Sequence, residues 1–110
     1  MLVYSNSVEG KDDEYQAWYD KHVSDLTRVE GFLSAQRFVI DSERSEPPGD
    51  ERKYLVVYEL DTDVPTALAN LRAAANSGAV ERPDIALVKD DIYSQVFTAI
   101  RAVVVGETRP

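Results

Sequence analysis

The sequence contains a single histidine, His22, inside a stretch whose spacing predicts a helix over residues 12–30. At 3.6 residues per turn, one face of this helix is mostly apolar and carries Tyr15, Trp18, Tyr19, His22, Leu26 and Val29. Asp25 lies at the edge of the same face, within reach of the imidazole. A histidine in this position is either a packed, hydrogen-bonded core residue or the polar lining of a pocket. In a pocket it could act as a general acid or base, with a pKa near neutrality that is tuned by burial and by Asp25.

Several other side chains could orient a ligand beside His22. We expect hydrogen bonds to a carbonyl or phenol group from Asn6, Tyr19, Gln36, Tyr58 and Tyr93, and stacking of Trp18 on an aromatic ring. Taken separately, the tyrosines also fit an amphipathic core. Arg37 and Glu59 are interpreted as a structural ion pair between neighbouring strands.

The sequence lacks the motifs of most cofactor and metal chemistries. With one histidine and no cysteine it cannot form a zinc site of the usual kind, and it has neither H-E-x-x-H nor clustered carboxylates. It has no G-x-G-x-x-G, no G-x-x-x-x-G-K-[ST] and no G-x-S-x-G motif. Haem would have only His22 as a natural axial ligand. We therefore expect no metal and no cofactor.

Length and charge limit the protein class further. The 110 residues fit one domain over residues 1–105, followed by a tail at 106–110. A net charge of −8 without a basic patch argues against nucleic acid and anionic membranes as partners. This charge either maintains solubility or steers a cationic ligand. No apolar run reaches the ~20 residues of a membrane span, and the N-terminus lacks the features of a signal peptide, so we expect a cytoplasmic location.

The remaining pattern predicts an α+β domain. Strands are expected at 2–8, 32–41, 53–60 and 92–105, and a second helix at 64–76. Asp12 or Asp13 should cap the first helix, Gly31 should follow its end, and Asp61-Thr62-Asp63 with Pro65 should begin the second. Residues 84–88 could form one short turn. Residues 42–52 read as a mobile connection or, alternatively, a lid.

The order β-α-β-β-α-β is typical of a ferredoxin-like fold, with a four-stranded antiparallel sheet and two helices on one face. The other face of the sheet should then be apolar, through Leu33, Ala35, Val39, Leu55, Val57, Val96 and Ile100. A monomer would expose this surface to water, so we expect a homodimer in which two such faces pack together.

Three motifs in this order resemble the EthD-like branch of the dimeric α+β-barrel superfamily. They are WYDKH at 18–22 with Asp25, GFLSAQRF at 31–38 and KYLVVYEL at 53–60, and residues 61–110 agree only in topology. The resemblance implies a site between the sheet and the helices of each monomer, where His22 would point. Members of the superfamily include polyketide cyclases, lactone isomerases and quinone-forming monooxygenases that need no cofactor, and aldoxime dehydratases that use haem.

Two functional hypotheses follow. The first is a small cofactor-independent enzyme of cyclase, isomerase, lyase or dehydratase type, in which His22 and Asp25 perform acid–base chemistry on an aromatic or polyketide-like compound. The second is a dimeric ligand-binding or accessory protein with the same fold and no chemistry.

Overall fold

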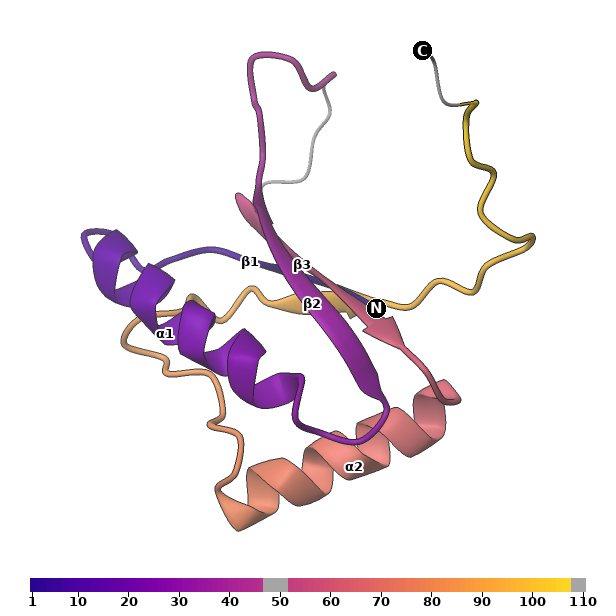
Figure 1. Cartoon of the computed structure of the whole chain (residues 1–110). Coiled ribbons are helices and arrows are strands. Elements are labelled where there is room, and N and C mark those ends of the chain that lie inside the picture. Colours follow the sequence, from indigo (N-terminus) through magenta and orange to yellow (C-terminus); the bar gives the residue numbers. More distant parts are fainter. Residues whose placement is uncertain (47–51, 108–110) are drawn as a thin grey trace.

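The computed structural model of the chain describes residues 1–46 and 52–107. Its elements are β1 (Leu2–Ser5), α1 (Asp12–Leu26), β2 (Phe32–Val39), β3 (Tyr54–Leu60), α2 (Val64–Ser77) and β4 (Tyr93–Gln95). The strands form one sheet in the order β2-β3-β1-β4, and all neighbouring pairs are antiparallel (Figure 1). The predicted α+β class, with a four-stranded antiparallel sheet and two helices, is confirmed. The element order is compatible with the ferredoxin-like fold.

The core lies between the helices and one face of the sheet. Burial alternates along β3, where Tyr54, Val56 and Tyr58 are buried, as expected for a strand with one covered face. These side chains cluster with residues of α1, of α2 and of the segment that follows α2, namely Tyr15, Tyr19, Leu26, Ala67, Val80 and Val88. The sheet therefore presents a helix-covered face and an outer face.

A bulge in β2 changes which of its side chains face the helices. The strand's register with β3 shifts between Phe32 and Ser34. After this shift Arg37 pairs with Val56 and therefore lies on the helix-covered face, whereas Gln36 lies on the outer face. The prediction that Gln36 shares a face with Phe32 is wrong, because strict alternation does not hold across a bulge.

The same shift alters the membership of the outer face. Ala35 and Val39 were expected there, but they pair with Tyr58 and Tyr54 on the helix-covered side. The register places the following residues on the outer face: Leu2, Tyr4, Ser34, Gln36, Phe38, Leu55, Val57, Glu59, Tyr93 and Gln95. This face is still largely apolar at its centre.

The two helices differ in how well their ends were predicted. α1 ends at Leu26, four residues before Glu30, and its N-cap is Lys11 without a side-chain hydrogen bond. Instead of capping, the Asp12 carboxylate accepts a hydrogen bond of 2.6 Å from the Tyr54 hydroxyl. For α2 the predicted signals are confirmed, since Asp63 caps the helix by accepting a hydrogen bond from the Thr66 backbone N–H at 3.0 Å.

Two strands are shorter than predicted. β1 ends at Ser5 rather than residue 8, and β4 covers Tyr93–Gln95 rather than residues 92–105. Leu2, the first residue of β1, pairs with Gln95, so the chain beyond Gln95 has run past its neighbouring strand. Residues 96–107 lie outside any strand; residues 96–99 adjoin the start of α2, and the later part extends away from both helices (Figure 1).

The connections agree with the sequence where the structure describes them. Residues 84–88 form the expected turn, in which Leu87 N–H donates to the Asp84 carbonyl at 2.9 Å. Of the loop predicted at 42–52, residues 47–51 lie outside the described part of the chain. None of the helices in the described part is long and apolar enough to cross a membrane.

Candidate functional site

His22 projects from α1 into a half-buried aromatic setting. Its ring stacks on Trp18, with centroids 4.5 Å apart and planes 18° from parallel, and meets the edge of Tyr19 at 5.6 Å. The backbone of Glu81 lies near the ring and favours its protonated form, as do the charges of Asp25 and Glu81. The Nδ1 atom is buried and has no hydrogen-bond partner among the described residues. A neutral imidazole carries a proton on one ring nitrogen and a lone pair on the other, so Nδ1 has the capacity for one further hydrogen bond.

Burial keeps His22 neutral. It lowers the pKa of His22 from 6.5 to about 4, while the charges of Asp25 and Glu81 act in the opposite direction. The expectation of a pKa near neutrality is wrong in this structure, because removing the ring from water outweighs the attraction of the nearby carboxylates. At neutral pH the unprotonated ring carries one donor and one acceptor nitrogen.

A cavity of about 250 Å³ adjoins His22 between α1, α2 and the sheet. Its lining is mostly aliphatic and aromatic, with polar groups mainly where the segment after α2 passes. The lining residues are Met1, Val3, Tyr19, His22, Leu26, Tyr58, Leu68, Leu71, Ala75, Val80, Glu81, Arg82, Pro83 and Ser94. Mostly apolar walls with a few polar groups are typical of small-molecule sites.

Two predicted tyrosines line this cavity together with His22. Tyr19 and Tyr58 are both buried, and burial raises the pKa of each phenol above its ordinary value. Both therefore remain protonated at neutral pH and keep an O–H donor. Trp18 does not line the cavity but packs behind the imidazole and fixes the plane of its ring.

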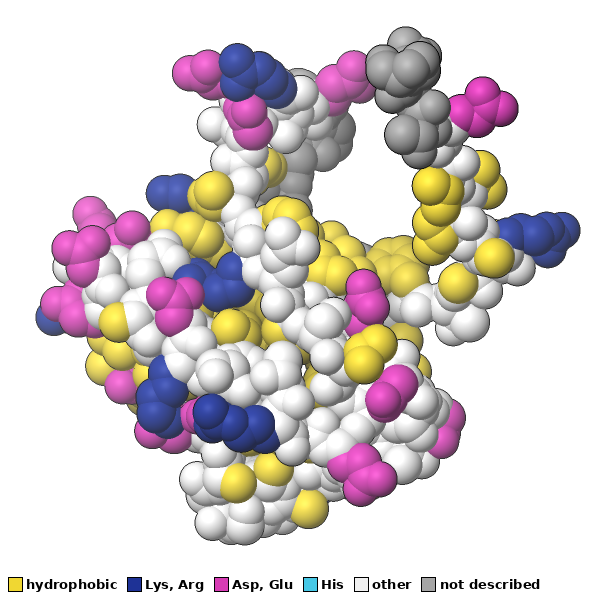
Figure 2. Space-filling model, viewed as in Figure 1, with side chains coloured by type: hydrophobic (Ala, Val, Ile, Leu, Met, Phe, Trp, Pro, Cys, Tyr) yellow, Lys and Arg dark blue, Asp and Glu magenta, His cyan; other side chains and the backbone are white. Residues whose placement is uncertain are grey.

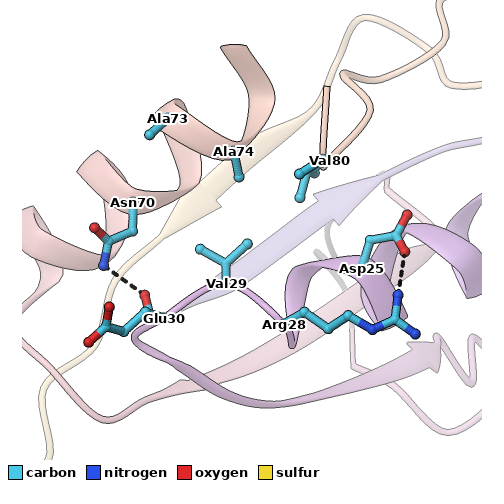
Figure 3. A pocket seen from close by; sticks show the side chains of 9 residues that line it. Asp25, Arg28, Val29, Glu30, Asn70, Ala73, Ala74 and Val80 are labelled. Carbon is cyan, nitrogen blue, oxygen red and sulfur yellow. Dashed lines mark hydrogen bonds and ion pairs between the residues drawn. The ribbon is translucent and has the colours of Figure 1, made fainter. Parts of the chain in front are cut away.

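Asp25 lines a different cavity from His22. Its carboxylate contacts Lys21 at 2.8 Å and Arg28 at 3.2 Å, and these two cations lower the pKa of Asp25. Figure 3 shows Asp25 paired with Arg28 at the end of α1, across a hollow of about 330 Å³ from α2. On the far side Asn70 donates to the Glu30 carbonyl at 2.8 Å. Asp25 therefore affects the His22 ring through its charge, which raises the pKa of the imidazole, and does not line the same cavity.

The structure does not bring Asn6, Gln36 and Tyr93 to the His22 cavity. Asn6 donates to Asp91 at 3.1 Å and accepts from the Lys53 backbone N–H at 2.7 Å, so it holds three segments together. Gln36 and Tyr93 lie on the outer face of the sheet. There the ring of Tyr93 stacks on that of Tyr4, with centroids 4.6 Å apart.

Arg37 is an unpredicted polar residue of the helix-covered face. It donates to Asp20 at 2.8 Å and to Gln16 at 2.6 Å, and its guanidinium lies 5.3 Å from the ring centroid of Tyr19. The predicted ion pair with Glu59 is therefore wrong. The sequence signal of the bulge that places Arg37 here was the pair of polar residues at 34 and 36, on a strand face whose other residues are typical of a core.

The described residues offer no metal site, since no three His, Cys, Asp or Glu side chains among residues 1–46 and 52–107 lie close enough to hold an ion. Comparison with protein-family models, with curated proteins and with solved structures finds no match to this chain. The resemblance to the EthD-like family therefore stays a prediction from the three motifs.

Proposed function

We propose that the protein binds a small, mostly apolar compound in the cavity beside His22 and removes a proton from it without a cofactor. The observation that carries this proposal is the buried Nδ1 atom of a neutral His22, which has no donor among the described residues. An unsatisfied buried polar atom costs roughly 1–3 kcal/mol. A ligand that donates a hydroxyl or an acidic C–H group to Nδ1 would recover this free energy.

The cavity supports a particular class of ligand. Its volume of about 250 Å³ lies below the ~300–1,000 Å³ of typical drug-sized sites, so we expect a compound of one or two rings. Leu26, Leu68 and Leu71 favour an apolar body. The protonated phenols of Tyr19 and Tyr58 favour a carbonyl or enolate oxygen as the second polar group. A phenol or an enolisable aromatic ketone has these features.

The single histidine makes this proposal directly testable by NMR. Phenols and enolisable ketones would be titrated into the protein while the imidazole signals, which can only be those of His22, are followed. We expect a compound that binds to shift these signals, and His22→Ala to lose binding. Asp25→Asn is the matched control and should retain binding, because Asp25 lines the neighbouring cavity. Unchanged binding by folded His22→Ala would refute the proposal.

A second candidate is a ligand-binding protein that performs no chemistry. It is favoured by the low pKa of His22, about 4, because a general base is most efficient when its pKa is near the working pH. Exchange of the bound compound's acidic C–H hydrogen in D₂O separates the two functions. Exchange that depends on His22 supports proton removal, and binding without exchange supports the second candidate.

We also propose that two copies of the chain pack through the outer face of the sheet. Leu2, Leu55, Val57 and Phe38 share this face, and the helix-packed core lies on the opposite side. Exposed apolar patches beyond a few hundred Å² mark interaction sites. Light scattering should give about twice the chain mass of 12.3 kDa, and a monomer at micromolar concentration would contradict the proposal.

A further inference from the structure

The segment after β4 is apolar, and its later part is almost fully exposed, whereas its first four residues, 96–99, adjoin Met1, β3 and the start of α2. Its large side chains are 82–93% exposed at Ile100, Val103, Val104 and Val105, and Phe97 is 65% exposed. Figure 2 shows these apolar side chains along a stretch that projects from the body. Fully burying one such side chain contributes about 1.5–3 kcal/mol. Burying several of them against another surface would therefore be strongly favourable.

The composition of the segment is that of a strand. Valine and isoleucine fill five of the ten positions in residues 96–105, and β-branched residues favour extended backbone in a half-buried sheet. The register explains why the strand does not continue. Gln95 is already opposite Leu2, the first residue of β1, so later residues of the segment are not paired with β1. An unpaired apolar strand of this kind readily joins another chain.

We propose that residues 96–105, here called the arm, pack against the outer sheet face of a second copy of this chain. This inference rests on the homodimer proposed above and adds an exchange of segments to it. Both surfaces are apolar and uncovered in one copy, and two-fold symmetry would let each arm cover the partner's face. A stable interface uses about 20–30 residues from each partner. The ten arm residues and the ten outer-face residues together reach this size.

Charge favours a second copy through the arm in particular. Two copies each carry a net charge of −8 and repel one another at most of their surface. The arm contains one charged residue, Arg101, which is positive. On the outer face the register places one charged residue, Glu59, which is negative. Glu59 can therefore attract Arg101, and another charge at this face is the Arg52 guanidinium, which lies 4.3 Å from the ring centroid of Tyr93.

Two isoleucines allow a matched test in the full chain. Ile100, in the arm, is 88% exposed, and Ile85, in the connection before β4, is 84% exposed. If neither residue lies in an interface, replacing either with aspartate should have the same small effect on the dissociation constant of the dimer. We expect Ile100→Asp to raise the dissociation constant of the dimer at least ~tenfold, and Ile85→Asp to change it less than ~twofold. Sedimentation at several dilutions measures both, and circular dichroism checks that both variants are folded.

The outcomes separate this inference from the homodimer itself. Equal dissociation constants for the two variants and the parent chain would overturn the proposed role of the arm in the interface, but not the homodimer itself. A parent chain that is monomeric at every dilution would overturn both.

Cysteine mapping shows which copy the arm contacts, because the chain has no cysteine of its own. Val104→Cys would be mixed with a differently tagged Gln36→Cys copy and treated with a short thiol cross-linker. We expect a mixed product of twice the chain mass, and none when the second copy is Asp13→Cys, an exposed residue of α1. A chain carrying both Val104→Cys and Gln36→Cys tests the alternative. If it cross-links only within itself, the arm folds back on its own sheet and the inference fails.

Discussion

At the scale of single residues, His22 links folding to pH. Burial lowers the pKa of His22 to about 4, whereas the ring titrates near 6.5 in an unfolded chain. Between these two values the unfolded state binds more protons than the folded state. The stabilisation from keeping His22 neutral is therefore fully present above pH 6.5 and is lost as the pH falls toward 4.

We expect the free energy of unfolding to fall by roughly 2 kcal/mol between pH 7 and pH 4.5 through this group, after discounting for its partial exposure. His22→Gln has no such titration and should lose stability less steeply over the same range. Urea unfolding at a series of pH values measures both slopes. Identical slopes would show that His22 does not carry the effect.

Arg37 supports a prediction at the same scale. Its guanidinium bonds Asp20 and Gln16 of α1 and lies over the Tyr19 ring, so it ties β2 to the helix. We expect Arg37→Lys to lose about 1–2 kcal/mol of stability, because an ammonium cannot reproduce the planar fork of donors. Arg44→Lys is the control, since Arg44 forms an exposed ion pair with Asp41 within one turn and joins no two elements of the described fold. A similar loss in both variants would contradict the role assigned to Arg37.

At the scale of elements, Gly31 sets the turn from α1 into β2. It has a φ of +101°, and a Cβ added there would lie 2.7 Å from Thr62 Cγ2, just before α2. We expect Gly31→Ala to lower the free energy of unfolding by about 2 kcal/mol, from backbone strain and from this clash. Gly10 has a similar φ of +78° but open space around it, so Gly10→Ala should cost only about 1 kcal/mol. Equal losses in chemical denaturation would exclude the clash.

The elements that the sequence predicted well are those with local signals. α2 begins and ends where Asp63, Pro65 and Gly78 indicate, because capping and positive φ depend on a few adjacent residues. The length of β4 was not predictable in this way. It depends on where β1 begins opposite it, which is a relation between residues about 90 positions apart.

The residues of the candidate site show the same difference between local signals and long-range relations. Tyr19 and His22 were predicted together because helical spacing alone places them on one face. Gln36 was misplaced because the polar residues at 34 and 36 indicate an irregularity without locating it, and a bulge reverses the faces of every later residue in β2. The pKa of His22 also depends on Glu81 and on burial, which only the packed chain determines.

At the scale of the whole molecule, charge and apolar surface act in opposite directions on assembly. A chain of net charge −8 repels a second copy. Burial of the outer sheet face and of residues 96–105, by contrast, favours association. The Debye length falls from about 30 Å at 0.01 M salt to about 8 Å at 0.15 M. Salt over this range therefore weakens the repulsion while leaving the burial of apolar surface almost unchanged.

We expect the dissociation constant of the proposed dimer to fall roughly threefold when sodium chloride is raised from 0.01 to 0.15 M, because screening removes part of the repulsion between two acidic chains. Sedimentation at fixed protein concentration measures the change, and choline chloride controls for specific binding of sodium. An interface held by ion pairs would respond in the opposite direction. A dimer that weakens as salt rises would thus place charged residues, rather than Leu55, Val57 and residues 96–105, at the centre of the contact.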